Sequence, residues 1–200
     1  MSWIKEIPYE EASPRLKKLY DRVSGGGQVD NVLKVHSLRP HTLTGHMYLY
    51  KNVLHNSNNT LPKWFLETIG VYVSWLNRCD YCVDHHSAGL SRLLADEEKA
   101  AGIHKALRDE QPEQYFEGRE LAALQYAAQL TRQPATVQEA DIEHLRNSGL
   151  TDGEILEVNQ VCSYFCYVNR TVLGLGVDIA GEIIGLSPSD SDDPDNWSHG

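Results

Sequence analysis

The amino-acid sequence predicts an all-α fold in a single domain, and three observations support this prediction. Apolar residues recur at helical spacing along most of the chain, and no segment alternates convincingly in the way of a half-buried strand. Capping residues, prolines and glycines separate the periodic segments. The chain has 200 residues, of which 41% are hydrophobic, and this is enough for one core built by helix-on-helix packing.

Four helices are expected in the first half of the chain. Ser13 and Pro14 are a capping residue and a proline suited to a first turn, so they mark a helix start. Pro40 separates two amphipathic segments. The segment 62–77 is apolar on most faces, so we expect a central, largely buried helix there. The expected helices span residues 13–23, 31–40, 41–56 and 62–77.

The second half is expected to be helical as well. Two Thr-x-x-Glu patterns, Thr136 with Glu139 and Thr151 with Glu154, are capping boxes that mark helix starts. The last periodic stretch is apolar and is expected to break near the glycines at 174–176. The other expected segments are 79–94, 95–107, 113–133 and 152–186.

Composition narrows the class of protein. The formal net charge is −10, which disfavours binding to the phosphate backbone of a nucleic acid. Residues 187–200 are acidic and are expected to form a disordered tail after a domain that spans 1–186. No apolar leader and no run of eighteen apolar residues occurs, so we expect a cytoplasmic protein that does not bind membranes. In that compartment a Cys-x-x-Cys motif is more typical of catalysis or metal binding than of a structural disulfide.

Cys79, Cys82 and His86 form the most informative cluster. At about 100° per residue all three share one face of a helix, whereas His85 points about 100° away from His86. Asn77 is a candidate N-cap, which would place both cysteines in a first turn, where the helix dipole favours a thiolate.

Glu67 lies twelve positions before Cys79. In one unbroken helix the two would be about 18 Å apart, too far to share a proton. A turn at residues 77–78 would fold Glu67 back beside the two thiols. A weak internal repeat pairs the segment 65–70 with 155–160, and it places Asn169 twelve positions after a second glutamate.

The residues leave several kinds of site open. Haem attachment requires a histidine directly after the second cysteine, and Val83 stands there. A zinc site would combine Cys79, Cys82 and His86 with a fourth ligand. Buried packing is the simplest interpretation of Cys162 and Cys166, but polar neighbours favour a redox dithiol at 79 and 82. The candidate fourth zinc ligands are Asp84, His85, Cys162 and Cys166.

The spacing of Glu67, Cys79, Cys82 and His86 resembles the alkyl hydroperoxidase D (AhpD)-like group of the carboxymuconolactone decarboxylase superfamily, in its peroxidase-related branch. The resemblance covers roughly residues 7–186. It implies an AhpD-like helical bundle, with the weak repeat as a pseudo-repeat, that assembles into homo-oligomers. It also implies a thiol-dependent hydroperoxide reductase with an antioxidant role, which uses no bound cofactor or metal.

The resemblance also implies a role for each matching residue. Cys82 is the peroxidatic thiol, Cys79 the resolving thiol, and Glu67 with His86 the proton relay. Tyr81 stands where the AhpD relay has a histidine, so we assign it an auxiliary role in passing a proton. An external thiol or dithiol, for which the family suggests a lipoylated protein, would reduce the disulfide. The alternatives are a carboxymuconolactone decarboxylase-like lyase and a non-enzymatic redox-sensing or metal-binding module.

Overall fold

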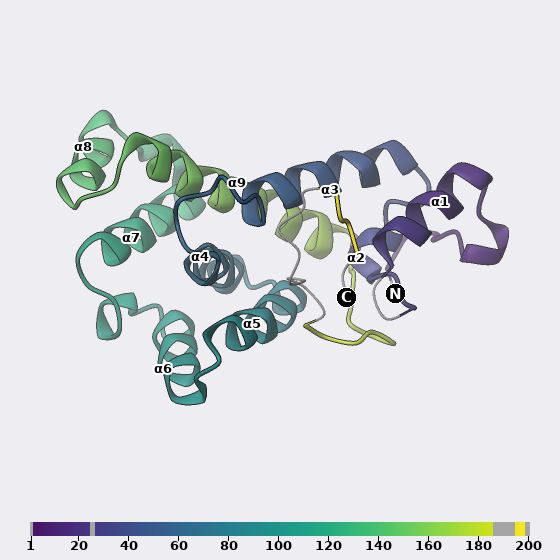
Figure 1. Cartoon of the computed structure of the whole chain (residues 1–200), viewed down its shortest axis with the longest axis horizontal. Helices are drawn as coiled ribbons and strands as arrows, with labels where there is room; N and C mark the ends of the chain where they lie inside the picture. Colours follow the sequence, from purple (N-terminus) through teal and green to yellow (C-terminus); the bar gives the residue numbers. More distant parts are fainter. Residues whose placement is uncertain (1, 25–26, 186–194, 199–200) are drawn as a thin grey trace.

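The computed structural model describes residues 2–24, 27–185 and 195–198, and in this part of the chain regular structure is helical, without a strand. This confirms the all-α prediction. No helix in the same residues is long and apolar enough to cross a membrane. The α-helices are α1 (Pro14–Val23), α2 (Asn31–Lys34), α3 (Pro40–Leu54), α4 (Lys63–Leu76), α5 (Asp80–Leu94), α6 (Glu97–Arg108), α7 (Gly118–Arg132), α8 (Glu139–Asn147) and α9 (Asp152–Leu175) (Figure 1).

Helix α4 is the centre of the core. All ten residues from Phe65 to Ser74 are buried, as expected for a helix that is apolar on most faces. α4 packs against α5, α7 and α9, and Figure 1 shows it almost end-on in the middle of the molecule. The prediction of a central, largely buried helix is therefore confirmed.

Capping patterns located two helix starts correctly and one incorrectly. The Ser13 side chain accepts a hydrogen bond from the Leu16 backbone at the start of α1, and the Thr151–Glu154 capping box is present at α9. The Thr136–Glu139 box is wrong. Thr136 belongs to a short 3-10 turn that begins at Pro134, so the capping box of α8 is formed by Gln138 and Asp141 instead.

Two other boundaries also differ from the expectation. Pro40 is not preceded by a long helix, and it opens α3. Proline is well tolerated there, because backbone N–H groups in the first turn of a helix have no partner within the helix. The last helix ends at Leu175, and Gly176 caps it in the left-handed conformation (φ 61°). The break expected near 174–176 is therefore confirmed. Residues 177–185 then run beside α2 and α5 without helical structure.

Most of the acidic segment 187–200 lies outside the described residues. Its described part, residues 195–198, packs on the domain, where we expected solvated chain. Trp197 is 1% exposed, because its ring lies 3.6 Å from the Arg22 guanidinium and packs edge-on against Tyr48.

Gly70 on α4 lies against the Phe165 side chain of α9. A Cβ at this position would overlap the ring of Phe165 on α9. We expect Gly70→Ala to lower the free energy of unfolding by about 1–3 kcal/mol, measured by urea denaturation, because the buried ring has little room to shift. Gly45→Ala on α3 is the control: nothing lies within 4 Å of that Cβ, so it should stabilise the protein by roughly 0.5–1 kcal/mol. Equal effects of the two substitutions would contradict this packing.

Candidate active site

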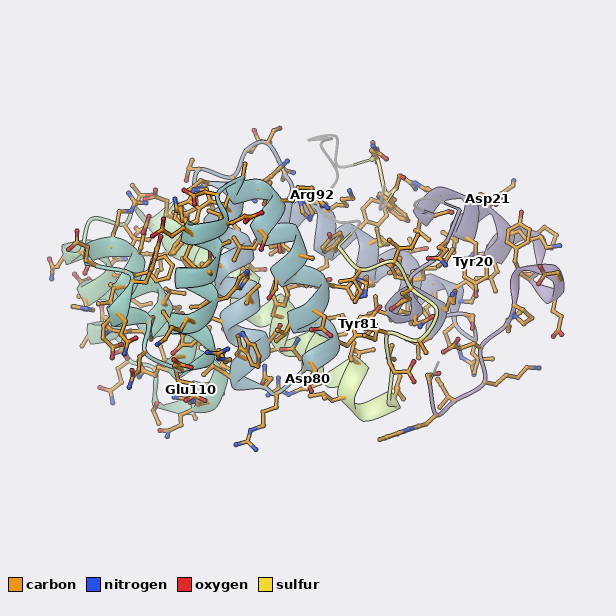
Figure 2. The ribbon with its side chains drawn as sticks, turned by 90° about the horizontal axis from the view of Figure 1, so that it is seen from below. Tyr20, Asp21, Asp80, Tyr81, Arg92 and Glu110 are labelled. Carbon is orange, nitrogen blue, oxygen red and sulfur yellow. The ribbon has the colours of Figure 1, made fainter. Side chains whose placement is uncertain are left out.

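The chain reverses direction between α4 and α5. Asn77 ends α4, Arg78 adopts a left-handed backbone conformation (φ 57°), and Cys79 is the N-cap of α5. Asn77 is therefore not the N-cap that the sequence suggested, because the extra left-handed residue delays the start of α5. The expected turn at 77–78 is confirmed, and both cysteines lie in the first turn of a helix. Asp80 and Arg92 mark the two ends of α5 in Figure 2.

Cys79 and Cys82 form a close pair of free thiols. Their Sγ atoms are 2.6 Å apart, and the residues are 0% and 3% exposed. The hydrogen bond between the two thiols lowers the pKa of Cys79, and the backbone N–H of Cys82 acts in the same direction. Burial raises the pKa of Cys82. The contact between the two thiols thus favours the thiolate form of Cys79 and the protonated form of Cys82.

Asn169 on α9 is a site residue that the sequence did not identify. Its side chain is fully buried, accepts a hydrogen bond from Asn77 Nδ2 (2.9 Å) and donates one to Ser74 Oγ (3.1 Å). A further hydrogen bond from this amide lowers the pKa of both Cys79 and Cys82. The one available signal was the weak internal repeat, which placed Asn169 in register with Cys79.

The reversal brings Glu67 on α4 beside His86 on α5. Glu67 Oε2 lies 2.7 Å from His86 Nδ1, and the carboxylate side chain is 1% exposed. Phe165 packs edge-on against the His86 ring, with centroids 4.6 Å apart, and helps to fix its orientation. The expected proximity of glutamate and histidine is thus confirmed, whereas the catalytic roles of these residues stay predictions.

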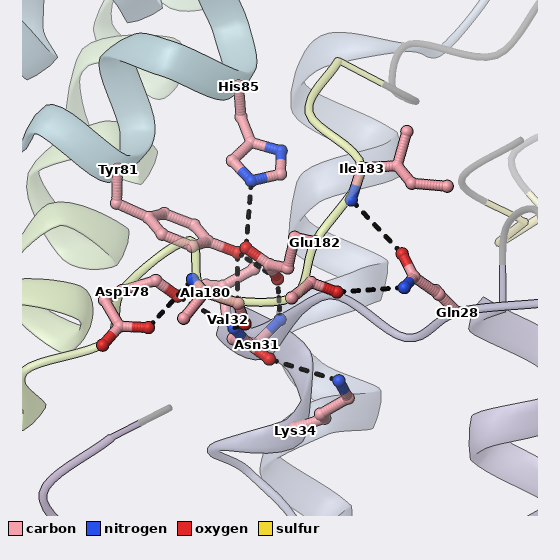
Figure 3. A network of polar contacts seen from close by, with 11 residues as sticks. Gln28, Asn31, Val32, Lys34, Tyr81, His85, Asp178, Ala180, Glu182 and Ile183 are labelled. Atoms are coloured by element: carbon pink, nitrogen blue, oxygen red, sulfur yellow. Dashed lines mark hydrogen bonds and ion pairs between the residues drawn. The ribbon is translucent and has the colours of Figure 1, made fainter.

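Tyr81 does not join the Glu67–His86 pair. Its hydroxyl donates to Glu182 Oε1 (3.0 Å) and accepts a hydrogen bond from the backbone N–H of Val32 (3.2 Å). Burial raises the pKa of the Tyr81 hydroxyl, and the Glu182 carboxylate raises it further. Tyr81 lies between α5 and the segment 177–185 (Figures 2 and 3), so its ring belongs to the wall of the site.

A small cavity of about 40 Å³ adjoins Cys82. Two histidines besides His86 line it, namely His46 and His85, and His85 Nε2 pairs with Glu182 Oε2 at 3.2 Å. Helical spacing did not predict this position of His85, because its partner Glu182 lies far away in the sequence. The other lining residues are Asp30, Val32, Tyr50, Tyr81, Tyr164 and Val168.

The second cysteine pair is only partly the packing feature that we expected. Cys162 is fully buried, but Cys166 is half-buried and lies 3.8 Å from Asn77 Nδ2. A hydrogen bond from Cys162 lowers the pKa of Cys166. In the described ranges 2–24, 27–185 and 195–198, no group of three or more His, Cys, Asp or Glu side chains is arranged to hold a metal ion, so the zinc alternative has no ligand set there.

Comparison with known proteins places this geometry in context. Residues 40–107 match the model of the carboxymuconolactone decarboxylase family. An uncharacterized peroxidase-related protein from Silicibacter sp. TM1040 has a similar structure, with 26% sequence identity, a TM-score of 0.75, and coverage of 88% of this chain and 91% of that one. A second such protein, from Ralstonia eutropha JMP134 and described as an alkylhydroperoxidase AhpD core, is 22% identical with a TM-score of 0.74, covering 92% and 97%.

A more distant structural neighbour has a different activity. The debrominase Bmp8, whose structure contains 2,3,4-tribromopyrrole, is 17% identical with a TM-score of 0.69, covering 90% of this chain and 95% of its own. At this identity the likeness shows the shared fold alone. No curated protein sequence matches this chain.

Proposed function

Because this chain belongs to the superfamily of AhpD and carboxymuconolactone decarboxylase, we propose that it is a thiol-dependent reductase of small hydroperoxides. The observation that carries the proposal is the position of Cys82. Its thiol borders a cavity, lies 2.6 Å from a second thiol, and shares that cavity with the imidazole of the Glu67–His86 pair.

In the first step Cys82 attacks the peroxide. Its proton passes to Cys79 or to His86, whose Nδ1 is held by Glu67. A sulfur–oxygen bond then forms as the O–O bond breaks, so that a thiol and ROOH become a sulfenic acid and ROH. Cys82 is oxidised by two electrons, and the peroxide is reduced by the same two.

In the second step Cys79 attacks the sulfenic acid of Cys82. A disulfide forms and water leaves. The two sulfurs already lie close together in the first turn of α5, so the step needs little movement. An external dithiol restores both thiols by exchange and is itself oxidised to a disulfide. We propose a lipoylated protein as the class of donor and a homo-oligomer as the working state, since the family resemblance implies both.

The size of the cavity supports a small substrate. A volume of about 40 Å³ exceeds the roughly 10–15 Å³ that one water molecule requires, but it is far below the ~300 Å³ of typical ligand pockets. Hydrogen peroxide and the simplest alkyl hydroperoxides fit this description. A lactone-decarboxylating lyase remains the alternative enzyme, but its chemistry gives no use for two adjoining thiols.

The variant Cys79→Ser tests the proposal. Without the resolving thiol, we expect one equivalent of hydrogen peroxide to leave a sulfenic acid on Cys82, which dimedone labels and peptide mass mapping locates. The wild type should give a Cys79–Cys82 disulfide and almost no dimedone adduct. The proposal fails if dimedone labels Cys166 instead of Cys82, or if neither protein consumes peroxide.

A further inference from the structure

A second carboxylate–imidazole pair lies beside the cavity, and its carboxylate comes from the segment after α9. The Glu182 side chain is 2% exposed. Its Oε1 accepts hydrogen bonds from the Tyr81 hydroxyl and from the backbone N–H of Asn31, and its Oε2 pairs with His85 Nε2 (Figure 3). Three groups from α2 and α5 thus converge on one buried carboxylate.

The segment that carries Glu182 is fixed to the fold. The Gln28 side chain donates to the carbonyl of Gly181 (2.9 Å) and accepts from the backbone N–H of Ile183 (3.2 Å). The Asn31 amide donates to the carbonyls of Asp178 (2.8 Å) and Ala180 (3.2 Å). Arg92 at the end of α5 donates to the carbonyl of Gly185. These hydrogen bonds therefore hold the backbone around Glu182 in a defined position, so its contact with His85 is part of the fold.

Both histidines lie one helix turn beyond Cys82 on α5. His85 is three residues and His86 four residues beyond Cys82, and both spacings make side chains neighbours on a helix surface. Each imidazole pairs with a different carboxylate. His86 pairs with Glu67 on α4, and His85 pairs with Glu182. Both rings border the cavity at Cys82.

Cleavage of a peroxide by a thiolate needs two proton movements. The thiol must lose a proton, and the departing oxygen must gain one unless the group leaves as a stable anion. The Glu67–His86 pair serves the first movement in the proposed function, which leaves the second without a group. Tyr81 is poorly suited to it, because its hydroxyl already donates to Glu182 and burial raises its pKa.

We propose that His85, oriented by Glu182, is the general acid that protonates the departing oxygen of the peroxide. The inference rests on the proposed function and completes its first step. As Cys82 sulfur bonds to one peroxide oxygen, the O–O bond breaks and the His85 proton moves to the other oxygen, which leaves as ROH. Solvent then returns a proton to the ring. Glu182 is a positioning residue, because it acts through His85.

A comparison of two peroxides tests this role. Hydrogen peroxide releases hydroxide, the strongly basic conjugate base of water, and so needs a proton donor. Peroxyacetic acid releases acetate, the conjugate base of a carboxylic acid with a pKa of about 4–5, and so needs no proton donor. We expect His85→Asn to slow oxidation of Cys82 by hydrogen peroxide on the order of 100-fold, and oxidation by peroxyacetic acid by less than about threefold. Glu182→Gln should show the same selectivity with a smaller loss.

The controls separate this inference from the proposed function. Iodoacetamide alkylation of Cys82 releases iodide and needs no acid, so its rate should be unchanged in a correctly folded His85→Asn protein. His144→Asn, on the exposed surface of α8, should behave as the wild type. Equal losses with both peroxides, or no loss with either, would overturn the role of His85. A wild type that reacts with neither peroxide would instead reject the proposed function, and this inference with it.

Discussion

Replacing Cys82 by serine is expected to abolish peroxide reduction, with kcat/KM falling by a factor on the order of 10³–10⁶. A serine hydroxyl at this position keeps the size of the side chain but stays protonated and is a much weaker nucleophile than a thiolate. Cys79 cannot replace the missing thiol, because it is fully buried and does not border the cavity. Peroxide consumption in the presence of excess dithiol measures the loss.

Cys162→Ser is the matched control for this experiment. Cys162 is also fully buried, but it lies on α9 beside Thr131 and away from the cavity. Its substitution should leave peroxide consumption within roughly twofold of the wild type, since Cys162 hydrogen-bonds with Thr131 and Ala127 and does not line the cavity. Similar activity in Cys82→Ser and Cys162→Ser would mean that Cys82 is not the attacking group.

The substitution Glu67→Gln is expected to lower kcat/KM by about 10²–10⁴-fold. An amide keeps the shape of the carboxylate, but it carries no negative charge, so it stabilises a protonated His86 ring, whose Nδ1 is 2.7 Å from Glu67, much less. Because Glu67 is buried, no solvent-exposed group can take its place. The initial rate of peroxide consumption, measured between pH 6 and 9, should fall throughout this range.

Glu157→Gln provides the comparison within the same chain. Glu157 stands in the position of Glu67 in the weak internal repeat, but its carboxylate accepts hydrogen bonds from the backbone of Thr60 and Leu61, away from the dithiol. Its substitution should lower stability slightly and leave the rate unchanged. A Glu67→Gln enzyme with the rate of the wild type would remove the Glu67–His86 relay from the mechanism but leave the dithiol in place.

The fold was largely predictable because its helices obey local rules. Apolar periodicity identified α4 as the central helix, and Ser13 and Thr151 located two helix starts correctly. The Thr136 cap was wrong because a neighbouring proline started a different turn, and sequence patterns alone do not rank two competing local structures. The short α2 and the start of α3 at Pro40 have the same explanation.

The candidate site was predictable only where one helix turn relates its parts. Cys79, Cys82 and His86 follow from helical spacing, and the turn at Arg78 then brings Glu67 to His86. Asn169 and Glu182 reach the site through tertiary contacts. The weak internal repeat alone relates Asn169 to Cys79, and no period in the sequence relates Glu182 to the cysteines. Glu182 is 97 residues from His85, in a segment without regular structure.

At Tyr81 the sequence indicated the departure from the AhpD pattern but not the contacts of the hydroxyl. The departure from the AhpD pattern at this position was evident, and an auxiliary proton-passing role was assigned to its hydroxyl. That hydroxyl instead holds Glu182, which in turn pairs with His85. The acid–base group that a histidine at 81 would supply is, in the further inference above, supplied by the histidine four residues later.

The central claim is that Cys79 and Cys82 act together to reduce a hydroperoxide. It is tested most directly by the intact mass of the fully reduced wild type after mixing with one equivalent of hydrogen peroxide. We expect a loss of about 2 Da, assigned by peptide mapping to a bond between Cys79 and Cys82, together with consumption of the peroxide. An unchanged mass with both thiols still free to react with an alkylating reagent, and the peroxide intact, would contradict it.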